Sequence, residues 1–206
     1  MSGDDNHHTM KYAKVLLIIL TAIGFICWHT SNRVTRFDLP DGELRWSHVK
    51  PANAKMCIPA AFTNEDGKIA GSYRYDGKNY QSGRALNMRV SLKGDIFYIS
   101  KQWMSDNGFQ QLTLVYNSKP MKFHDSRRAI RRALCKDEKG TFILQSNYPM
   151  TLSDFAIECG KRSTNATYLD MGEYGYGYIK KHCFIRPLYI WGFFTRHKQT
   201  NWIYIE

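Results

Sequence analysis

The sequence predicts an α+β domain built mostly of antiparallel sheets with one or two helices, preceded by a single N-terminal transmembrane helix. Three observations support this class: many short β-rich runs separated by turn dipeptides, one well-capped helical run, and an apolar stretch near the N-terminus. Of the 206 residues, 43% are hydrophobic and 23% charged, which is typical of a globular domain with an ordinary core.

The apolar stretch runs from Val15 to Trp28, and no charge appears until Arg33. The uncharged window Val15–Asn32 is 18 residues, just enough to span a bilayer. A cleaved signal peptide is the alternative, although no small-residue cleavage site follows the run. We expect a short cytoplasmic tail over residues 1–14, a signal anchor over 15–32, a linker over 33–50 and a folded domain over 51–206. The domain would then be extracytoplasmic, on the periplasmic side of the inner membrane in a bacterium.

Turn dipeptides divide the domain into strands. Asp-Gly in "NEDGK" and "YDGKNY", and "KGD" further on, predict tight turns between strands. "RRALCKDEKGTFILQS" predicts two strands joined by a turn, and "FQQLTLVYNSKP" one alternating strand that ends at a turn. "MTLSDFAIECG" is the clear helix, capped by Thr151 or Ser153 and stopped by Gly160. "ATYLDM" predicts a central strand, and "QTNWIYIE" a further one.

The net charge of +11 lies almost wholly in the domain, because residues 1–32 are neutral. A basic surface attracts phosphate, anionic lipid, acidic glycan or nucleic acid without choosing among them. We expect no nucleic-acid partner, because an exported domain rarely meets one and no RNA-binding or helix-turn-helix pattern is visible. The sequence has no P-loop, dinucleotide-binding glycine motif or serine nucleophile elbow, and we expect no cofactor.

Four cysteines fall in the predicted domain: Cys57, Cys135, Cys159 and Cys183. An even number outside the cytosol is compatible with disulfides, and buried free thiols are equally compatible with the sequence. No C-x-x-C is present and the histidine and cysteine spacings do not resemble a zinc site, so we expect no metal.

The stretch "NATYLDMGEYGYGYIKK" places two carboxylates, Asp170 and Glu173, where a strand gives way to alternating glycine and tyrosine. Gly172 allows the backbone to turn sharply, and tyrosines can stack on sugar rings. Glycoside cleavage uses two carboxylates about 5–9 Å apart. We therefore predict Asp170 and Glu173 as catalytic residues. The plainer alternatives are a turn-capping Asp170, a solvated Glu173 and an ordinary hairpin.

The order of the short motifs resembles the phosphodiester glycosidase family, over roughly residues 52–206. Family members share an Asn-Gly-Gly-Phe motif after an aliphatic strand, and here Phe62 is kept while Pro59, Ala60 and Ala61 replace the other three residues. Its Arg-Thr-Ala motif corresponds to Arg131, Arg132 and Ala133, so the arginine is kept and the threonine is not.

Two later motifs complete the resemblance. The family's Asp-Gly-Gly-Gly-Ser corresponds to Asp170, Met171, Gly172, Glu173 and Tyr174, and its late asparagine to Asn201. The resemblance implies a sugar phosphodiester as substrate, a phosphate contact from Arg131, and further substrate contacts from Asn201, Phe62, Gly172 and Tyr174.

Two hypotheses follow for the function. The first is a membrane-anchored hydrolase that cleaves a sugar phosphodiester or a related glycosidic bond in envelope glycans. The second is a binding module on the same fold that has lost catalysis and holds a glycan or sugar phosphate; the changes at Pro59–Ala61 favour it. Convergence of Asp170, Glu173, Arg131 and Asn201 on an open cleft would favour the enzyme. The oligomeric state stays open.

Overall fold

The structure is a computed structural model that describes residues 14–21, 33–64, 66–81, 86, 88–171, 177–179 and 201–206, with the backbone of 182–183. The chain divides into two compact units, Met1–Arg33 and Val34–Glu206. In the first unit residues 14–21 are helical and exposed. Within the described ranges, no helix has both the length and the apolar character needed to cross a bilayer. Residues 22–32 of the predicted anchor lie outside those ranges, so the anchor stays a prediction.

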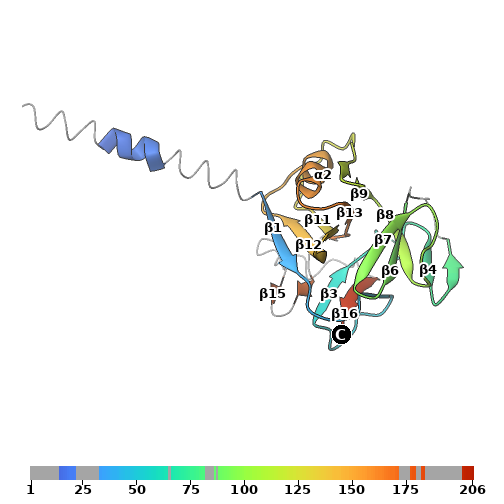
Figure 1. The fold of residues 1–206 in the computed structure, drawn as a ribbon. Helices are drawn as coiled ribbons and strands as arrows, with labels where there is room; N and C mark the ends of the chain where they lie inside the picture. The colour runs from blue at the N-terminus through green and yellow to red at the C-terminus, as the bar shows by residue number, and fades with distance from the viewer. Residues whose placement is uncertain are drawn as a thin grey trace, which may run out of the picture. The chain divides into compact units, whose positions relative to one another are not determined.

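The described residues of the second unit form three antiparallel sheets and one helix, α2, which packs on the six-stranded sheet (Figure 1). The predicted α+β class with mostly antiparallel sheets is confirmed. In spatial order, the six-stranded sheet consists of β1 (Val34–Asp38), β12 (Gly140–Ser146), β11 (Arg132–Asp137), β13 (Asn165–Tyr168), β9 (Thr113–Tyr116) and β10 (Lys119–Pro120). One five-stranded sheet consists of β15 (His182–Cys183), β14 (Tyr178–Ile179), β3 (Met56–Pro59), β16 (Trp202–Ile205) and β2 (Arg45–Ser47). The other consists of β5 (Lys78–Tyr80), β4 (Tyr73–Tyr75), β8 (Gly108–Gln111), β6 (Met88–Lys93) and β7 (Ile96–Ser100).

The range 33–50, for which the sequence predicts a linker running into an edge strand, contributes both β1 and β2. β1 pairs with β12 from Val34 opposite Ser146 to Asp38 opposite Phe142, and β2 pairs with β16. Each lies at an edge of its sheet. These residues therefore belong to the folded unit.

The Asp-Gly turns form where the sequence predicts them. Tyr75 lies opposite Lys78, and Asp76 and Gly77 between them both have positive φ angles, of 49° and 72°. This geometry matches the right-handed twist of the paired strands β4 and β5. The β6–β7 hairpin turns at Gly94, which has φ of 65°.

The run "FQQLTLVYNSKP" differs from the prediction, because it contributes to three strands, β8, β9 and β10, in two different sheets. β8 pairs with β4 and β6, whereas β9 pairs with β13 and β10. Leu112 carries the chain from one sheet to the other. Alternation of residues is the same in both strands, so the pattern does not reveal the change of sheet. The junction places the side chain of Gln111 deep inside the unit.

Two clusters of buried side chains cover the two faces of the six-stranded sheet. Leu134 and Ile143 face the inter-sheet core, which also contains Ile58 and Val90 from the five-stranded sheets. Their strand neighbours point the other way, into the helix-side core under α2. This helix-side core includes side chains from the six-stranded sheet and from α2. Among them are Cys135, Phe142, Leu144, Phe155, Ala156 and Cys159.

Helix α2 (Leu152–Gly160) has the predicted boundaries. Thr151 is the N-cap, and its Oγ1 accepts a hydrogen bond of 3.1 Å from the backbone N–H of Asp154. At the other end, a Cβ on Gly160 would lie 2.6 Å from Cγ of Pro120. Glycine thus lets the helix pack closely against β10.

Candidate functional site

The segment 60–63, which follows β3, is the point where several predicted site residues meet. The carbonyl oxygen of Ala60 accepts a 2.9 Å hydrogen bond from the backbone N–H of Asp170 and a 3.3 Å bond from Nε2 of Gln111. Leu169 N–H donates to the carbonyl of Arg132. Asp170 is half-buried there, at the end of β13. The predicted strand end that presents Asp170 is therefore fixed by backbone contacts on both sides.

Asn201 is fully buried and binds the same segment from the other side. Its Oδ1 accepts from the backbone N–H of Ala61 at 2.7 Å and from Nε1 of Trp46 at 3.4 Å. Its Nδ2 donates to the carbonyl of Ala61 at 3.1 Å and to Oγ1 of Thr63 at 3.4 Å. Both ends of the amide thus bind protein groups, and Asn201 holds the 60–63 segment against β16.

Phe62 and Tyr168 form an aromatic contact on the helix-side face of the six-stranded sheet. Their ring centroids are 5.4 Å apart, with an interplanar angle of 41°. Phe62 is partly buried and packs against the helix-side core, of which Tyr168 is a member. Phe62 therefore contributes apolar contact and anchors the 60–63 segment to β13.

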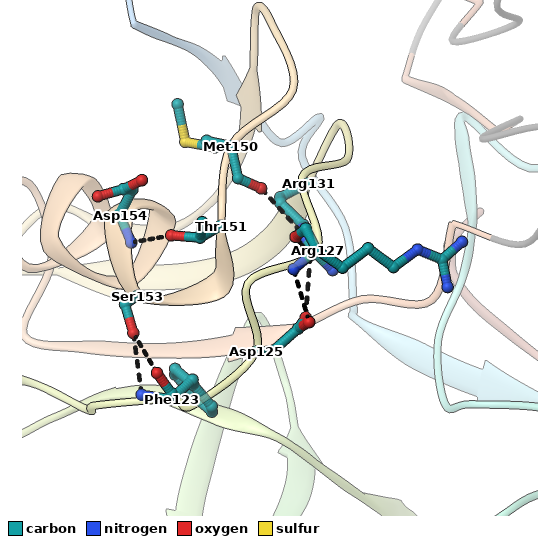
Figure 2. Close-up of polar contacts among 8 residues, drawn as sticks. All are labelled: Phe123, Asp125, Arg127, Arg131, Met150, Thr151, Ser153 and Asp154. Carbon is teal, nitrogen blue, oxygen red and sulfur yellow. Dashed lines mark hydrogen bonds and ion pairs between the residues drawn. The ribbon is translucent and has the colours of Figure 1, made fainter.

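Arg131 is 7% exposed and binds the loop that precedes β11 (Figure 2). Its Nη2 donates to the carbonyl of Arg127 at 2.6 Å and forms an ion pair of 3.2 Å with Asp125 Oδ2, and its Nε donates to the carbonyl of Met150 at 3.3 Å. The guanidinium carbon lies 5.9 Å from the ring centroid of Tyr168. These contacts make Arg131 a support of the loop as well as a neighbour of Tyr168.

Arg132 is the buried arginine on the opposite face, which the sequence reasoning did not single out. It is 0% exposed, and Oε1 of Gln145 accepts bonds from its Nε at 3.0 Å and its Nη2 at 2.7 Å. In a strand, successive side chains point to opposite faces, so only one of the two arginines can face the inter-sheet core. The sequence held one signal for the burial of Arg132: in "RRALC", Arg132 lies two positions before the apolar Leu134 and therefore shares its face, which meets the inter-sheet core.

The pKa of the Tyr168 hydroxyl is affected by Asp170 and by the two neighbouring arginines. Burial raises the pKa of Tyr168, and the positive charges of Arg131 and Arg132 partly oppose that rise. The carboxylate of Asp170 acts in the same direction as burial. One carboxylate and two guanidinium groups thus act on a single hydroxyl, which stays protonated at neutral pH.

The other predicted site residues, Gly172, Glu173 and Tyr174, lie outside the described residues. Of those that are described, Asp170 and Asn201 bind the backbone of the 60–63 segment, Phe62 belongs to it, and Arg131 is linked to it only through Tyr168, which Phe62 contacts. Ala60 and Ala61 are 0% and 1% exposed. As far as the described residues go, the meeting point is a packed junction.

An open groove of about 980 Å³ lies beside this junction. Gln111 joins the two, because the residue belongs to the groove lining and its buried side chain donates to the carbonyl of Ala60. Strand ends of two sheets and the loop after β10 form its walls. The lining residues are Met88, Ser100, Lys101, Gln102, Met104, Gln111, Leu112, Thr113, Tyr116, Met121, Lys122, Phe123 and His124.

The groove lining includes basic side chains. Lys101, Lys122 and His124 line it, and the loop continues to the exposed Arg127 and Arg128. The loop is fixed to the N-terminus of α2, because Ser153 Oγ accepts from Phe123 N–H at 2.9 Å and donates to Phe123 O at 2.8 Å (Figure 2). In the same view the guanidinium of Arg127 points away from the Asp125–Arg131 pair. Sequence reasoning missed the groove, although "MKFHDSRR" carries its charge.

The described cysteines are buried thiols. Cys57, Cys135 and Cys159 are free, and burial raises the pKa of Cys57 to about 11. Side-chain description does not extend to Cys183, so a pairing that involves it stays open. Among the described residues, no group of three or more histidine, cysteine or acidic side chains is arranged to hold a metal ion.

Comparisons with known proteins show a distant fold relationship. No protein-family model and no curated protein matches the sequence. The fold is similar to that of the zebrafish N-acetylglucosamine-1-phosphodiester α-N-acetylglucosaminidase catalytic domain, solved in a form auto-inhibited by its pro-peptide, with 15% identity and a TM-score of 0.51 over 84% of this chain and 72% of that one. A hypothetical protein from Synechocystis gives 12% identity and a TM-score of 0.45, over 85% of this chain and 57% of that one. The first match shows that this chain is related in fold to a phosphodiester glycosidase catalytic domain.

Proposed function

We propose that this chain is a membrane-anchored extracytoplasmic protein that binds an anionic sugar ligand, a sugar phosphate or acidic glycan, in the basic groove beside Asp170. The observation on which the proposal rests is the groove itself, whose lining includes Lys101, Lys122 and His124 together with the exposed Tyr116. Cations attract the phosphate or carboxylate, and an aromatic face packs on the sugar ring.

The packed junction favours binding over hydrolysis. In a glycosidase, two carboxylates must reach the scissile bond from either side. Here Ala60 and Ala61 are buried, and Asn201 and Arg131 bind protein groups. An anionic ligand in the neighbouring groove needs none of these side chains to move.

The test is calorimetric titration of the full chain, in mild detergent, with N-acetylglucosamine 1-phosphate. We expect saturable binding that the double variant Lys101→Gln/Lys122→Gln weakens about tenfold, because two favourable charges are lost. The matched control is Lys78→Gln/Lys139→Gln, which removes the same charge from exposed positions outside the groove lining. Absence of saturable binding, or equal losses in the two double variants, would overturn the proposal.

Hydrolysis of a sugar phosphodiester is the second candidate, and the position of Asp170 favours it. The carboxylate is half-buried at a rigid strand end and acts on the same hydroxyl as two guanidinium groups. Catalysis would consume one water and release the free sugar and a phosphate monoester. A chromogenic N-acetylglucosamine phosphodiester tests this: turnover by the wild type and its loss in Asp170→Asn would support it. A folded wild type without turnover would remove hydrolysis of that substrate and leave the binding proposal standing.

A further inference from the structure

A second pocket, of about 420 Å³, opens at another place on the folded unit. It lies where the β2 strand, the β4–β5 turn and the β6–β7 turn approach one another. None of its lining residues belongs to the basic groove. The lining residues are Glu43, Leu44, Arg45, Trp46, Tyr75, Asp76, Leu92, Lys93, Gly94, Asn107 and Tyr204.

The charges of this pocket balance, although the chain as a whole is strongly basic. Glu43 and Asp76 supply two carboxylates, and Arg45 and Lys93 two cations. Arg45 is also tied to Glu43 at 3.1 Å and to Glu206 at 2.9 Å. A balanced set of charged donors and acceptors does not attract an anion, but it can hydrogen-bond to neutral hydroxyl groups.

Aromatic side chains form one wall. Trp46 is buried at the centre of a cluster, with ring-centroid distances of 4.6 Å to His48, 5.4 Å to Tyr73 and 5.8 Å to Tyr75. The ring of Tyr75, 39% exposed, lies at the edge of the cluster and lines the pocket. The rigid packing behind it means that little side-chain freedom remains to be lost when a ligand covers it.

The turn that carries Asp76 is held in place before any ligand arrives. Asn107 Oδ1 accepts from Asp76 N–H at 3.1 Å, and Asp106 O accepts from Gly77 N–H at 3.0 Å. Arg74 adds a bond from its Nε to the carbonyl of Gly77 at 3.1 Å. On the opposite wall, Leu44 N–H donates to Gly94 O at 2.7 Å. The pocket is therefore built from braced segments.

We infer that this pocket binds a neutral saccharide unit, separately from the basic groove. A sugar ring has an apolar C–H face that packs on an aromatic ring and a rim of hydroxyl groups that donate and accept hydrogen bonds. Tyr75 offers the ring, and Glu43, Arg45, Asp76, Lys93 and Asn107 offer the polar partners. The volume lies within the range of small-molecule sites, about 300–1,000 Å³.

The experiment uses the full chain in mild detergent and a panel of neutral methyl glycosides of glucose, galactose, mannose and N-acetylglucosamine. Saturation-transfer NMR detects binding, and tryptophan fluorescence, compared between the wild type and a Trp46→Phe variant, shows the part of the signal that comes from Trp46. We expect at least one glycoside to bind and Tyr75→Ala to weaken it about tenfold, because the stacking face is removed. Asp76→Asn should weaken it less, since asparagine keeps the positive φ and part of the hydrogen bonding.

Tyr116→Ala is the matched control, because Tyr116 and Tyr75 are equally exposed, at 39%. Tyr116→Ala should leave glycoside binding unchanged and weaken the binding of N-acetylglucosamine 1-phosphate. Tyr75→Ala should weaken glycoside binding and leave the binding of N-acetylglucosamine 1-phosphate unchanged. No saturable glycoside binding by the folded wild type, unchanged binding in both Tyr75→Ala and Asp76→Asn, or an equal loss in Tyr116→Ala would overturn the inference. None of these results bears on the sugar phosphate, so the two proposals fail separately.

Discussion

At the scale of single residues, the sequence alone allows Asn201 either to contact a ligand or to hold the fold together. An asparagine in a late strand is compatible with a ligand contact, because its amide donates and accepts hydrogen bonds. The structure places both ends of that amide on Ala61, with Trp46 and Thr63 as additional partners. A linear sequence does not reveal which partner lies nearby, since those groups are about 140 positions away.

We predict that Asn201→Ala destabilises the folded unit by about 2–4 kcal/mol, because buried backbone groups of Ala61 lose their partners. Chemical denaturation followed by circular dichroism measures the change. Asn147→Ala is the control, since Asn147 is exposed and accepts one bond from Thr35; its cost should be below about 1 kcal/mol. Equal stability of Asn201→Ala and the wild type would contradict the role of a clamp.

At the scale of elements, α2 depends on a buried acid near its C-terminal end. The side chain of Glu158 is 2% exposed, and it pairs with Lys161 at 2.9 Å and Arg162 at 2.7 Å. Burial opposes ionisation of this carboxyl, but hydrogen bonds and charges from the two cations outweigh it, so the pKa of Glu158 lies below its ordinary value. Because the pKa of Glu158 is lower in the folded state than in the unfolded state, its ionised form stabilises the fold. This stabilisation is fully present above the unfolded-state pKa and is lost as the pH falls through the folded-state pKa.

We predict that Glu158→Gln costs about 1–2 kcal/mol at neutral pH and that the difference from wild type shrinks in acid, beginning near the unfolded pKa of about 4.3. Thermal melts between about pH 3 and pH 7 measure it. Glu138→Gln, at an exposed position in the β11–β12 turn, should match the wild type throughout. A gap for Glu158→Gln that stays constant with pH would show that the ion pairs contribute nothing.

Elements were predictable where a local signal fixes them. Asp76-Gly77 and Gly94 turn because their positive φ angles suit these residues, and Thr151 caps α2 through its own hydroxyl. The change of sheet at Leu112 was not predictable, because alternation of residues continues across it. Alternation in "RRALC" predicts that Arg131 and Arg132 point to opposite faces, but which core each face meets is decided only when β11 pairs with β12 and β13.

At the scale of the whole molecule, the net charge of +11 has a measurable consequence. We predict that affinity for N-acetylglucosamine 1-phosphate falls by about tenfold or more between about 0.05 M and 0.5 M sodium chloride, because salt screens the basic groove. Affinity for a neutral methyl glycoside should change less than about twofold over the same range. Titrations at several salt concentrations compare the two ligands. Salt-independent binding of the sugar phosphate would argue against an electrostatic groove.

The overall class and the fold relationship were within reach of the sequence, and the binding surfaces were not. The basic groove combines Met88, Gln111 and His124, which come from different strands and a loop. The second pocket combines Glu43, Asp76 and Lys93 in the same way. Such surfaces exist only after distant strands pair, so no contiguous motif marks them.

The order of strands in the sheet that contains β3 bears on how the protein is made. β3 pairs with β14 and β16, and β2 pairs with β16, so both early strands take partners that the ribosome synthesises much later. While the chain emerges, their backbone edges have nothing native to pair with, and bare edges of this kind invite pairing with other chains. Completion of the sheet must therefore wait until Trp202–Ile205 has emerged. During that interval we expect β2 and β3 to be the segments of this sheet most open to pairing with other chains.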